Sequence, residues 1–331
     1  MIAVIPIAGV GLRLRPHTYT QPKPLLPVAG KPIISYIVDE LLDAGVEEVI
    51  FIVGYLGEKI IHFVNERYPD LKKSFLTQEE RLGSAHAIWQ AREKIRKADE
   101  LLILFGDAII ETDFEKIFNA STSCFGVMKV DEPSLYGVVE MEGSKVVRLE
   151  EKPVIPCSDI AMAGVYKIIE VPLFLKALNV VIDRGLEQQE EYYLTNVFSQ
   201  MIGYGVDFCV EEVDDWHDCG KIESLLKTNA NFLDKREGES IEVPPFYNSI
   251  IIHPVSIGEN CNINNSIIGP HVTVGDRVNI DNAIIKNSII GNFANIKEVI
   301  LQESVIGSDT SITGLKQKLN IGDDTNIDFS L

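Results

Sequence analysis

The chain has 331 residues, enough for about two domains that each bury a hydrophobic core. Its composition of 46% hydrophobic and 24% charged residues is typical of globular proteins and excludes wholesale disorder or a coiled-coil rod. The net charge of −19 disfavours nucleic acid and membrane partners, because an acidic chain repels phosphodiesters and anionic lipids unless its positive charge is concentrated locally.

Cysteine usage and the first residues predict a cytoplasmic protein. The five cysteines form an odd number without a CxxC pair, which fits neither a disulfide framework nor a zinc knuckle, so we expect reduced thiols. The apolar segment 1–12 has no basic region ahead of it and is too short to cross a bilayer. We therefore interpret it as a buried strand rather than a signal peptide.

Residues 1 to about 130 alternate short apolar runs with amphipathic stretches, a pattern typical of strands and crossover helices in a parallel sheet. The expected strands are 2–7, 47–54 and 101–107. Helices are expected over 33–42, followed by Gly45 as a C-terminal cap, and over 84–95.

The middle of the chain adds antiparallel structure. The segment 136–152 predicts a hairpin that turns at residues 142–144. A further helix over 223–234 is expected to close the first domain. We therefore place one domain at residues 1–240 and a second at 241–331.

The second domain contains a regular repeat. Ile-Gly or Val-Gly pairs begin at residues 257, 274, 290, 306 and 321, and another isoleucine follows each pair's first residue by six positions. A period of about 16 residues with one aliphatic residue per short edge predicts stacked coils of a β-solenoid. An ordinary β-sandwich is the alternative.

Positive charge is concentrated beside the first strand. The first 38 residues contain four cations and no acidic residue: Arg13, Arg15, Lys23 and Lys31. Gly9 and Gly11 follow the strand directly, where backbone N–H groups can approach a phosphate and arginine can bind its oxygens. The motif is neither GxGxxG nor a P-loop, so a plain turn with surface arginines remains the alternative.

Two further features suggest a phosphate site. Four prolines surround Lys23 in QPKPLLPVAGKP and predict an extended loop that fixes the direction of the ammonium group. Asp107 and Asp218 each end a short apolar strand or turn, and two converging carboxylates suit a magnesium ion. On spacing alone, unrelated turn or capping residues are the favoured interpretation.

The ordered motifs resemble those of the sugar-1-phosphate nucleotidylyltransferase family. They are AGVGLRLRPHTYTQPKPLLPVAGKP, QEERLGSAHA, FGD, YGVVE, LEEKP, AGVY, EYYLT and WHDCGK. The resemblance covers about residues 1–235 and implies an α/β fold with a Rossmann-like mixed, mainly parallel sheet. The repeats resemble a left-handed parallel β-helix of hexapeptide repeats, a frequent partner of that domain.

The resemblance also implies a set of site residues. Ala8, Gly9, Gly11, Gln78 and Gly83 would bind the nucleotide, and Asp107 and Asp218 would hold Mg²⁺. Arg13, Lys23 and Lys152 would act as catalytic cations, and Gly137, Glu151, Lys152 and Glu191 would bind the sugar phosphate. His17, His86 and His217 are expected to be orienting or structural groups.

The expected reaction joins a sugar 1-phosphate, preferably glucose 1-phosphate, to the α-phosphate of dTTP or UTP. Gln78 favours these bases, because an amide can accept from N3–H and donate to O4. N-Acetylglucosamine-1-phosphate uridylyltransferase and mannose-1-phosphate guanylyltransferase are the alternatives, and a non-catalytic regulatory or scaffolding homologue is another. An acyltransferase role for the solenoid is disfavoured, and we expect the solenoid to form a homo-oligomer.

Three residues depart from the family pattern. Leu12 replaces a small hydroxyl residue, which removes one possible phosphate hydrogen bond, and Asn196 replaces a common aspartate. Met162 replaces an asparagine near the sugar, and its thioether offers a hydroxyl or acetamide no strong partner.

Overall fold

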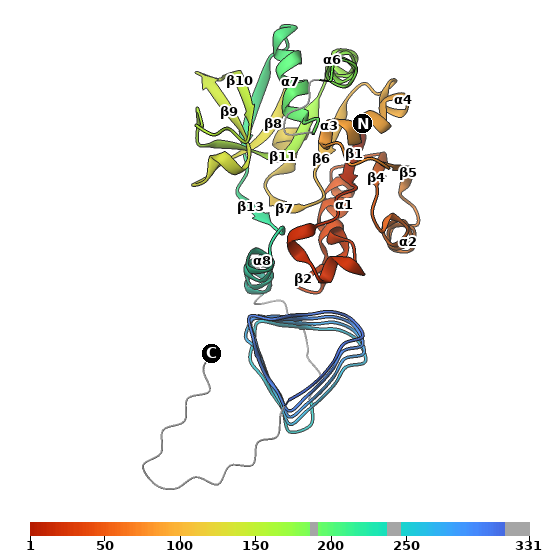
Figure 1. Cartoon of the computed structure of the whole chain (residues 1–331), viewed down its shortest axis with the longest axis vertical. Coiled ribbons are helices and arrows are strands. Elements are labelled where there is room, and N and C mark those ends of the chain that lie inside the picture. Colours follow the sequence, from red (N-terminus) through yellow and green to blue (C-terminus); the bar gives the residue numbers. More distant parts are fainter. Residues whose placement is uncertain (186–190, 237–245, 315–331) are drawn as a thin grey trace. The chain divides into compact units, whose positions relative to one another are not determined.

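The computed structural model describes residues 1–185, 191–236 and 246–314 (Figure 1). The chain divides into two compact units, Met1–Thr228 and Asn229–Leu331. The predicted domain boundary between residues 240 and 241 lies outside the described residues.

A mixed sheet forms the centre of the first unit, with the strand order β10-β9-β11-β6-β1-β4-β5, and β8 pairs with both β11 and β12. The strands β6, β1, β4 and β5 run parallel, whereas β11 is antiparallel to β6, β8 and β9. The bounds are β1 Ile2–Ile7, β4 Glu48–Val53, β5 Lys72–Thr77, β6 Leu101–Leu104, β8 Ser123–Lys129, β9 Gly137–Glu142, β10 Lys145–Glu151, β11 Ile160–Ile168 and β12 Phe208–Glu212. The predicted mixed, mainly parallel α/β fold is confirmed.

Helices cover both faces of this sheet because its central strands are apolar on both sides. In β1, Val4 packs in one hydrophobic core and Ile5 in the other. The first core includes residues of α3, α4, α6 and α7, and the second includes residues of α1, α2 and α5. The bounds are α1 Ile33–Asp43, α2 Gly57–Arg67, α3 Ser84–Gln90, α4 Arg92–Ile95, α5 Phe114–Phe118, α6 Val171–Asp183, α7 Leu194–Gly203 and α8 Ile222–Lys235.

Several short elements complete the first unit. Three 3₁₀ turns cover Leu12–Leu14, His17–Tyr19 and Lys23–Leu25, and a fourth covers Pro133–Leu135. A small hairpin joins β2 Pro27–Val28 to β3 Lys31–Pro32. A separate antiparallel ribbon pairs β7 Ala108–Glu111 with β13 Asp215–Asp218.

The predicted strands, first helix and hairpin are all present, but two segments differ from the prediction. The expected helix over 84–95 divides at Ala91 into α3 and α4. At this point, the Arg92 guanidinium donates a hydrogen bond to the Trp89 carbonyl oxygen at 2.9 Å. The loop around Lys23 is not extended throughout: Lys23–Leu25 forms a 3₁₀ turn between extended Pro22 and Leu26.

The second unit is a parallel β-helix whose coils outline a triangle (Figure 1). Within the described residues its three four-stranded sheets have the orders β14-β17-β20-β23, β15-β18-β21-β24 and β16-β19-β22-β25. The bounds are β14 Ile250–Ile251, β15 Val255–Ile257, β16 Asn262–Asn264, β17 Ile267–Ile268, β18 Val272–Val274, β19 Asn279–Asp281, β20 Ile284–Lys286, β21 Ser288–Ile290, β22 Asn295–Lys297, β23 Ile300–Gln302, β24 Val305–Ile306 and β25 Ser311–Thr313.

Both predicted aliphatic ladders are present in this unit. Ile257, Val274, Ile290 and Ile306 occupy one ladder, and Ile263, Ile280, Ile296 and Ile312 occupy the other. The repeat analysis missed the third ladder, which β14, β17, β20 and β23 form. The predicted coil beginning at residue 321 lies outside the described residues. Among the described residues, no helix combines the length and apolarity needed to cross a membrane.

Candidate active site

A cavity of about 640 Å³ lies at the carboxyl ends of three parallel strands of the first unit. Its walls include Ile7 and Ala8 at the end of β1, Gln78 after β5, and Asp107 after β6. Ligands of open α/β sheets bind at this edge, because the loops that follow the strands leave a crevice there. The cavity therefore occupies the position at which sequence analysis places the phosphate site.

The loop after β1 forms one wall of this cavity with Gly9, Val10, Gly11, Leu12 and Arg13. Gly11 has a φ of 69°, in the left-handed region, and a Cβ there would lie 3.1 Å from Thr18 Cγ2. The Thr18 hydroxyl donates a hydrogen bond to the Gly11 carbonyl oxygen at 2.9 Å, which fixes the turn. A glycine at this position thus allows the backbone itself to line the cavity.

The cations of the acid-free segment separate into two groups. Arg13 and Lys23 line the cavity. Arg15 instead stacks on the Tyr19 ring at 4.9 Å, and Lys31 pairs with Asp39 at 2.5 Å. The predicted phosphate cations are therefore the two that face the cavity.

Lys23 and Asp107 lie together at the cavity, with Lys23 Nζ 3.5 Å from Asp107 Oδ2. The Lys23 side chain is only 9% exposed, whereas that of Asp107 is 62% exposed. A largely buried ammonium group is costly without anionic partners. Lys23 thus presents a fixed positive charge, and Asp107 keeps carboxylate surface available to a cation.

Asp218 reaches the same region through the β7–β13 ribbon. Its Cα partner in the antiparallel register is Ala108, which directly follows Asp107. Asp218 Oδ1 accepts a hydrogen bond from the Gly220 backbone N–H at 2.8 Å, and Gly220 lines the cavity. A Cβ on Gly220 would lie 2.7 Å from Arg13 Nη2 and 2.8 Å from Asp218 Oδ1. The ribbon therefore brings the two predicted metal ligands, far apart in sequence, to one end.

Gln78 lines the cavity and is almost completely buried, and its amide nitrogen is hydrogen-bonded within the protein. Nε2 donates to the Gly83 carbonyl oxygen and lies near His86 Nδ1, both at 3.1 Å. Burial lowers the pKa of His86, which favours the neutral ring that can accept such a bond. The predicted orienting role of His86 has a geometric basis. Both Gln78 amide hydrogens are directed at groups within the protein, which does not fit the predicted donation to a base O4, and Oε1 remains as the acceptor expected for N3–H.

The residues predicted for the sugar surround the end of the β9–β10 hairpin. Gly137 borders the Glu151 carboxylate, the Met162 sulfur and the Thr195 hydroxyl. Thr195 donates a short hydrogen bond to Glu151 Oε2. Burial raises the pKa of Glu151 and nearby Glu191 raises it further, while the Thr195 hydrogen bond and the Lys152 charge lower it. The outcome is a carboxyl group with a pKa above its usual range.

The segment that begins at Glu191 connects the sugar residues to the cavity. Glu191 lines the cavity, and burial together with the neighbouring Glu191 carboxylate raises the pKa of the Tyr193 hydroxyl. Lys152 Nζ lies 4.9 Å from the centre of the Tyr193 ring. The Tyr192 backbone N–H donates to the Leu82 carbonyl oxygen at 2.7 Å, and the Tyr192 carbonyl oxygen accepts from the Ala85 N–H at 2.8 Å, on either side of Gly83. One short segment thus contacts both predicted subsites.

The family model described as nucleotidyl transferase matches residues 2–235, which include every one of these site residues. The chain belongs to the nucleotidyl transferase family. It is 35% identical over 238 residues to the bifunctional protein GlmU of Methanococcus maripaludis, covering 71% of this chain and 55% of that protein. It is also 31% identical over 277 residues to the mannose-1-phosphate guanylyltransferase catalytic subunit beta of Xenopus tropicalis, covering 79% and 74%.

A solved structure from Bacillus anthracis, assigned as a glucose-1-phosphate thymidylyltransferase, has the same fold. It superposes with a TM-score of 0.60 at 24% identity and covers 70% of this chain and 95% of its own. The 331-residue chain spans about half the length of the GlmU relatives that it matches.

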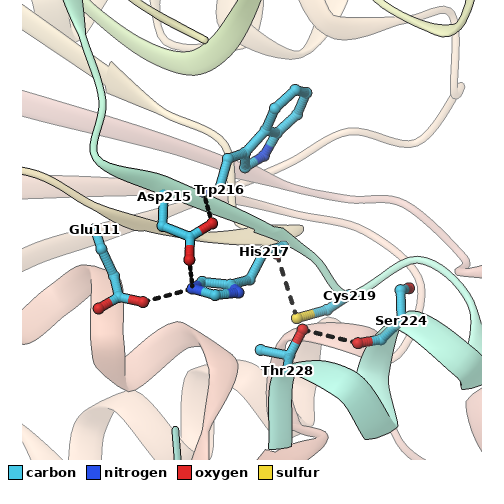
Figure 2. Close-up of polar contacts among 7 residues, drawn as sticks. All are labelled: Glu111, Asp215, Trp216, His217, Cys219, Ser224 and Thr228. Atoms are coloured by element: carbon cyan, nitrogen blue, oxygen red, sulfur yellow. Dashed lines mark hydrogen bonds and ion pairs between the residues drawn. The ribbon is translucent and has the colours of Figure 1, made fainter. Parts of the chain in front are cut away.

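The β7–β13 ribbon also carries a polar cluster around His217 (Figure 2). Buried His217 Nε2 lies 2.5 Å from Glu111 Oε1 and 3.3 Å from Asp215 Oδ2, and the Cys219 thiol donates to the His217 carbonyl oxygen at 3.6 Å. The contacts fix β13 against β7 just before Asp218, in agreement with a structural role for His217. The side chains of Glu111, Asp215 and His217 could also hold a cation, since their ligand atoms lie within 4.8 Å of one another.

Sequence analysis missed two residues that the structure adds to the site. Arg81 lines the cavity as a third cation, and its position between Gln78 and Gly83 in the motif was the available signal. Thr195, in EYYLT, binds Glu151. That contact could not be anticipated, because 44 residues separate the partners.

Proposed function

We propose that the chain catalyses transfer of a nucleotidyl group from dTTP or UTP to a sugar 1-phosphate. A phosphate oxygen of the sugar phosphate attacks the α-phosphorus, the bond to the β-phosphate oxygen breaks, and pyrophosphate leaves. The observation that carries this proposal is the common cavity of Arg13, Lys23 and Asp107 beside the Gly9–Gly11 loop.

The cations address the main physical obstacle to the reaction. Both reactants are polyanions, so repulsion and misorientation dominate the barrier. Arg13 and the nearly buried Lys23 would neutralise charge on the α-phosphate and the leaving pyrophosphate, with Arg81 as a further cation. A phosphate monoester is ionised at pH 7, so its attack requires no general base.

Magnesium fits the donor set at the end of the ribbon. Asp107 and Asp218 offer carboxylate oxygens, the ligands that this hard cation prefers, and both would hold it. When bound, Mg²⁺ supplies positive charge to phosphate oxygens. We expect Asp107→Asn and Asp218→Asn each to abolish magnesium-dependent turnover without unfolding the protein. Exposed Asp214→Asn, in the loop directly before β13, is the matched control.

Glucose 1-phosphate is the preferred acceptor in this proposal. Glu151 and Glu191 provide acceptors for sugar hydroxyls, and Lys152 provides a cation for the sugar phosphate. The Met162 thioether beside Gly137 offers neither a sugar hydroxyl nor an acetamide a strong hydrogen-bond partner, so a substrate panel has to separate glucose from N-acetylglucosamine.

A pyrophosphate-release panel tests the proposal. Four nucleoside triphosphates would be paired with glucose, N-acetylglucosamine and mannose 1-phosphates, with and without EDTA. We expect turnover to be fastest with dTTP or UTP and glucose 1-phosphate and to stop with EDTA. A preference for GTP with mannose 1-phosphate would instead indicate a guanylyltransferase, and no release with any pair would indicate a non-catalytic homologue.

We also propose that the β-helix forms a homo-oligomer through its third ladder. Ile250, Ile284 and Ile300 occupy outward positions of one sheet and are 59%, 43% and 73% exposed. Such a stripe suits a second copy, because two-fold symmetry places the same apolar ladder opposite itself. Light scattering of the wild type should give a multiple of 36.8 kDa. The double variant Ile284→Lys, Ile300→Lys should have a lower mass. A monomeric mass for the wild type would reject the proposal.

A further inference from the structure

Two cysteines occupy paired positions on neighbouring strands of the first unit. Cys209 in β12 is the register partner of Cys124 in β8, and the two strands run parallel. Neighbouring strands lie about 4.8 Å apart, and paired residues project to the same face of the sheet. This spacing falls within the range of about 4.4–6.8 Å between Cα atoms that a disulfide requires.

The two thiols differ in acidity because they interact. The neighbouring Cys124 thiol lowers the pKa of Cys209, and the Cys209 thiol together with burial raises the pKa of Cys124. Thr122 lowers the pKa of Cys209 further, against opposing effects of burial and Glu211. These directions favour thiolate on Cys209 over thiolate on Cys124.

Access also separates the pair. Cys124 is buried, whereas Cys209 is half-buried on β12, which pairs only with β8 among the described strands. A small oxidant can thus reach the sulfur that is more acidic. The inner thiol stands where a resolving cysteine is needed, within reach of the first.

The remaining thiols lack this combination. Burial raises the pKa of Cys157, Cys219 and Cys261, although Cys157 is exposed to solvent. If exposure alone controlled oxidation, Cys157 would be oxidised first. If thiol acidity and a neighbouring thiol controlled it, Cys209 would be oxidised first, because Cys124 lies beside it. The contrast makes Cys157 the internal reference for any thiol-specific reaction.

We propose that Cys209 and Cys124 form a thiol–disulfide redox pair that reacts with peroxides. The Cys209 thiolate attacks one oxygen of hydrogen peroxide, the O–O bond breaks, and the sulfur becomes a sulfenic acid as hydroxide leaves and takes up a proton to form water. The Cys124 sulfur then attacks the Cys209 sulfur, its proton leaves with the hydroxyl group as a second water, and an S–S bond forms. In total, two thiols lose two hydrogens and one peroxide becomes two waters.

The test uses the reduced full-length protein with stoichiometric hydrogen peroxide at pH 7, followed by alkylation and peptide mass mapping. We expect one cross-linked peptide pair, joining Cys124 to Cys209, which a dithiol reductant removes. In Cys124→Ser, a sulfenic acid on Cys209 should accumulate and be trapped by dimedone. Cys157→Ser should give the same cross-link at the wild-type rate.

Alkylation kinetics on the unmodified wild type make the test independent of how the variants fold. Iodoacetamide at pH 7 should label Cys209 at least tenfold faster than Cys157. Faster labelling of Cys157, or oxidation without the Cys124–Cys209 cross-link, would overturn the proposal.

Discussion

Lys23 Nζ lies 3.5 Å from the Asp107 carboxylate, although Asp107 is mostly exposed and Lys23 is almost completely buried. The lysine thus holds its charge where solvent screens it poorly, at the wall of the cavity proposed for the phosphates. In the proposed reaction, Lys23 would neutralise anionic substrates, and Asp107 would keep a carboxylate available for a cation.

Replacing Lys23 by methionine keeps the apolar stem and removes only the charge. We expect turnover to fall by about 100-fold or more, the usual effect of losing one preorganised charge contact in an active site. Steady-state pyrophosphate release would measure this loss of turnover, and thermal unfolding would check that the variant is folded. Lys31→Met is the matched control, because Lys31 pairs with Asp39 away from the cavity and should lose less than twofold.

A side chain at Gly220 should disturb the site without touching the core. In Gly220→Ala, the added methyl group would meet Arg13 Nη2 and Asp218 Oδ1 at under 3 Å, so one of the two must move. We expect turnover to fall at least about tenfold with little change in melting temperature. Gly203→Ala, where a methyl group has open space, should retain wild-type turnover; equal effects of both changes would contradict this account.

Gln78→Glu should impair nucleotide binding. The new carboxylate would replace the amide hydrogens that serve the Gly83 carbonyl oxygen and His86, and would repel that carbonyl. We expect the KM for dTTP or UTP to rise about tenfold, which corresponds to roughly 1.4 kcal/mol, within the range for an unsatisfied buried polar group. Gln90→Glu, which also contacts His86 but does not line the cavity, is the control. An unchanged nucleotide preference would mean that the base is recognised elsewhere.

The raised pKa of Glu151 predicts a dependence of stability on pH. Below the ordinary glutamate pKa of 4.5, the folded and unfolded states both carry a protonated side chain. As the pH rises through the higher folded-state pKa, the buried group must ionise, so folding loses stability. Glu151→Gln cannot ionise, and its stability advantage over wild type should therefore grow with pH above 4.5.

Urea unfolding of both proteins between pH 4 and pH 8 would measure this difference. Glu142→Gln changes an exposed glutamate of the same hairpin, so its difference from wild type should stay flat across that range. A flat difference for Glu151→Gln as well would show that burial does not control this carboxyl group.

Local patterns in the amino-acid sequence predict most of the strands and helices and indicate where the candidate site lies. Apolar runs predicted β1, β4 and β6, the turn at residues 142–144 predicted the hairpin, and the repeat of Ile-Gly pairs predicted two ladders of the β-helix. These properties depend on local periodicity, which a single chain displays directly. The acid-free first 38 residues likewise indicated the cationic wall before any contact was known.

Which residues face one another follows from the folded chain and not from local sequence. Sequence could not separate Arg13 and Lys23 from Arg15 and Lys31, because exposure to the cavity depends on how the loop after β1 folds. The antiparallel register of β7 and β13 brings Asp218 beside Asp107 across 111 residues of chain. The pairing of Cys124 with Cys209 arises in the same way. Such contacts follow from long-range packing and strand register, which no local pattern encodes.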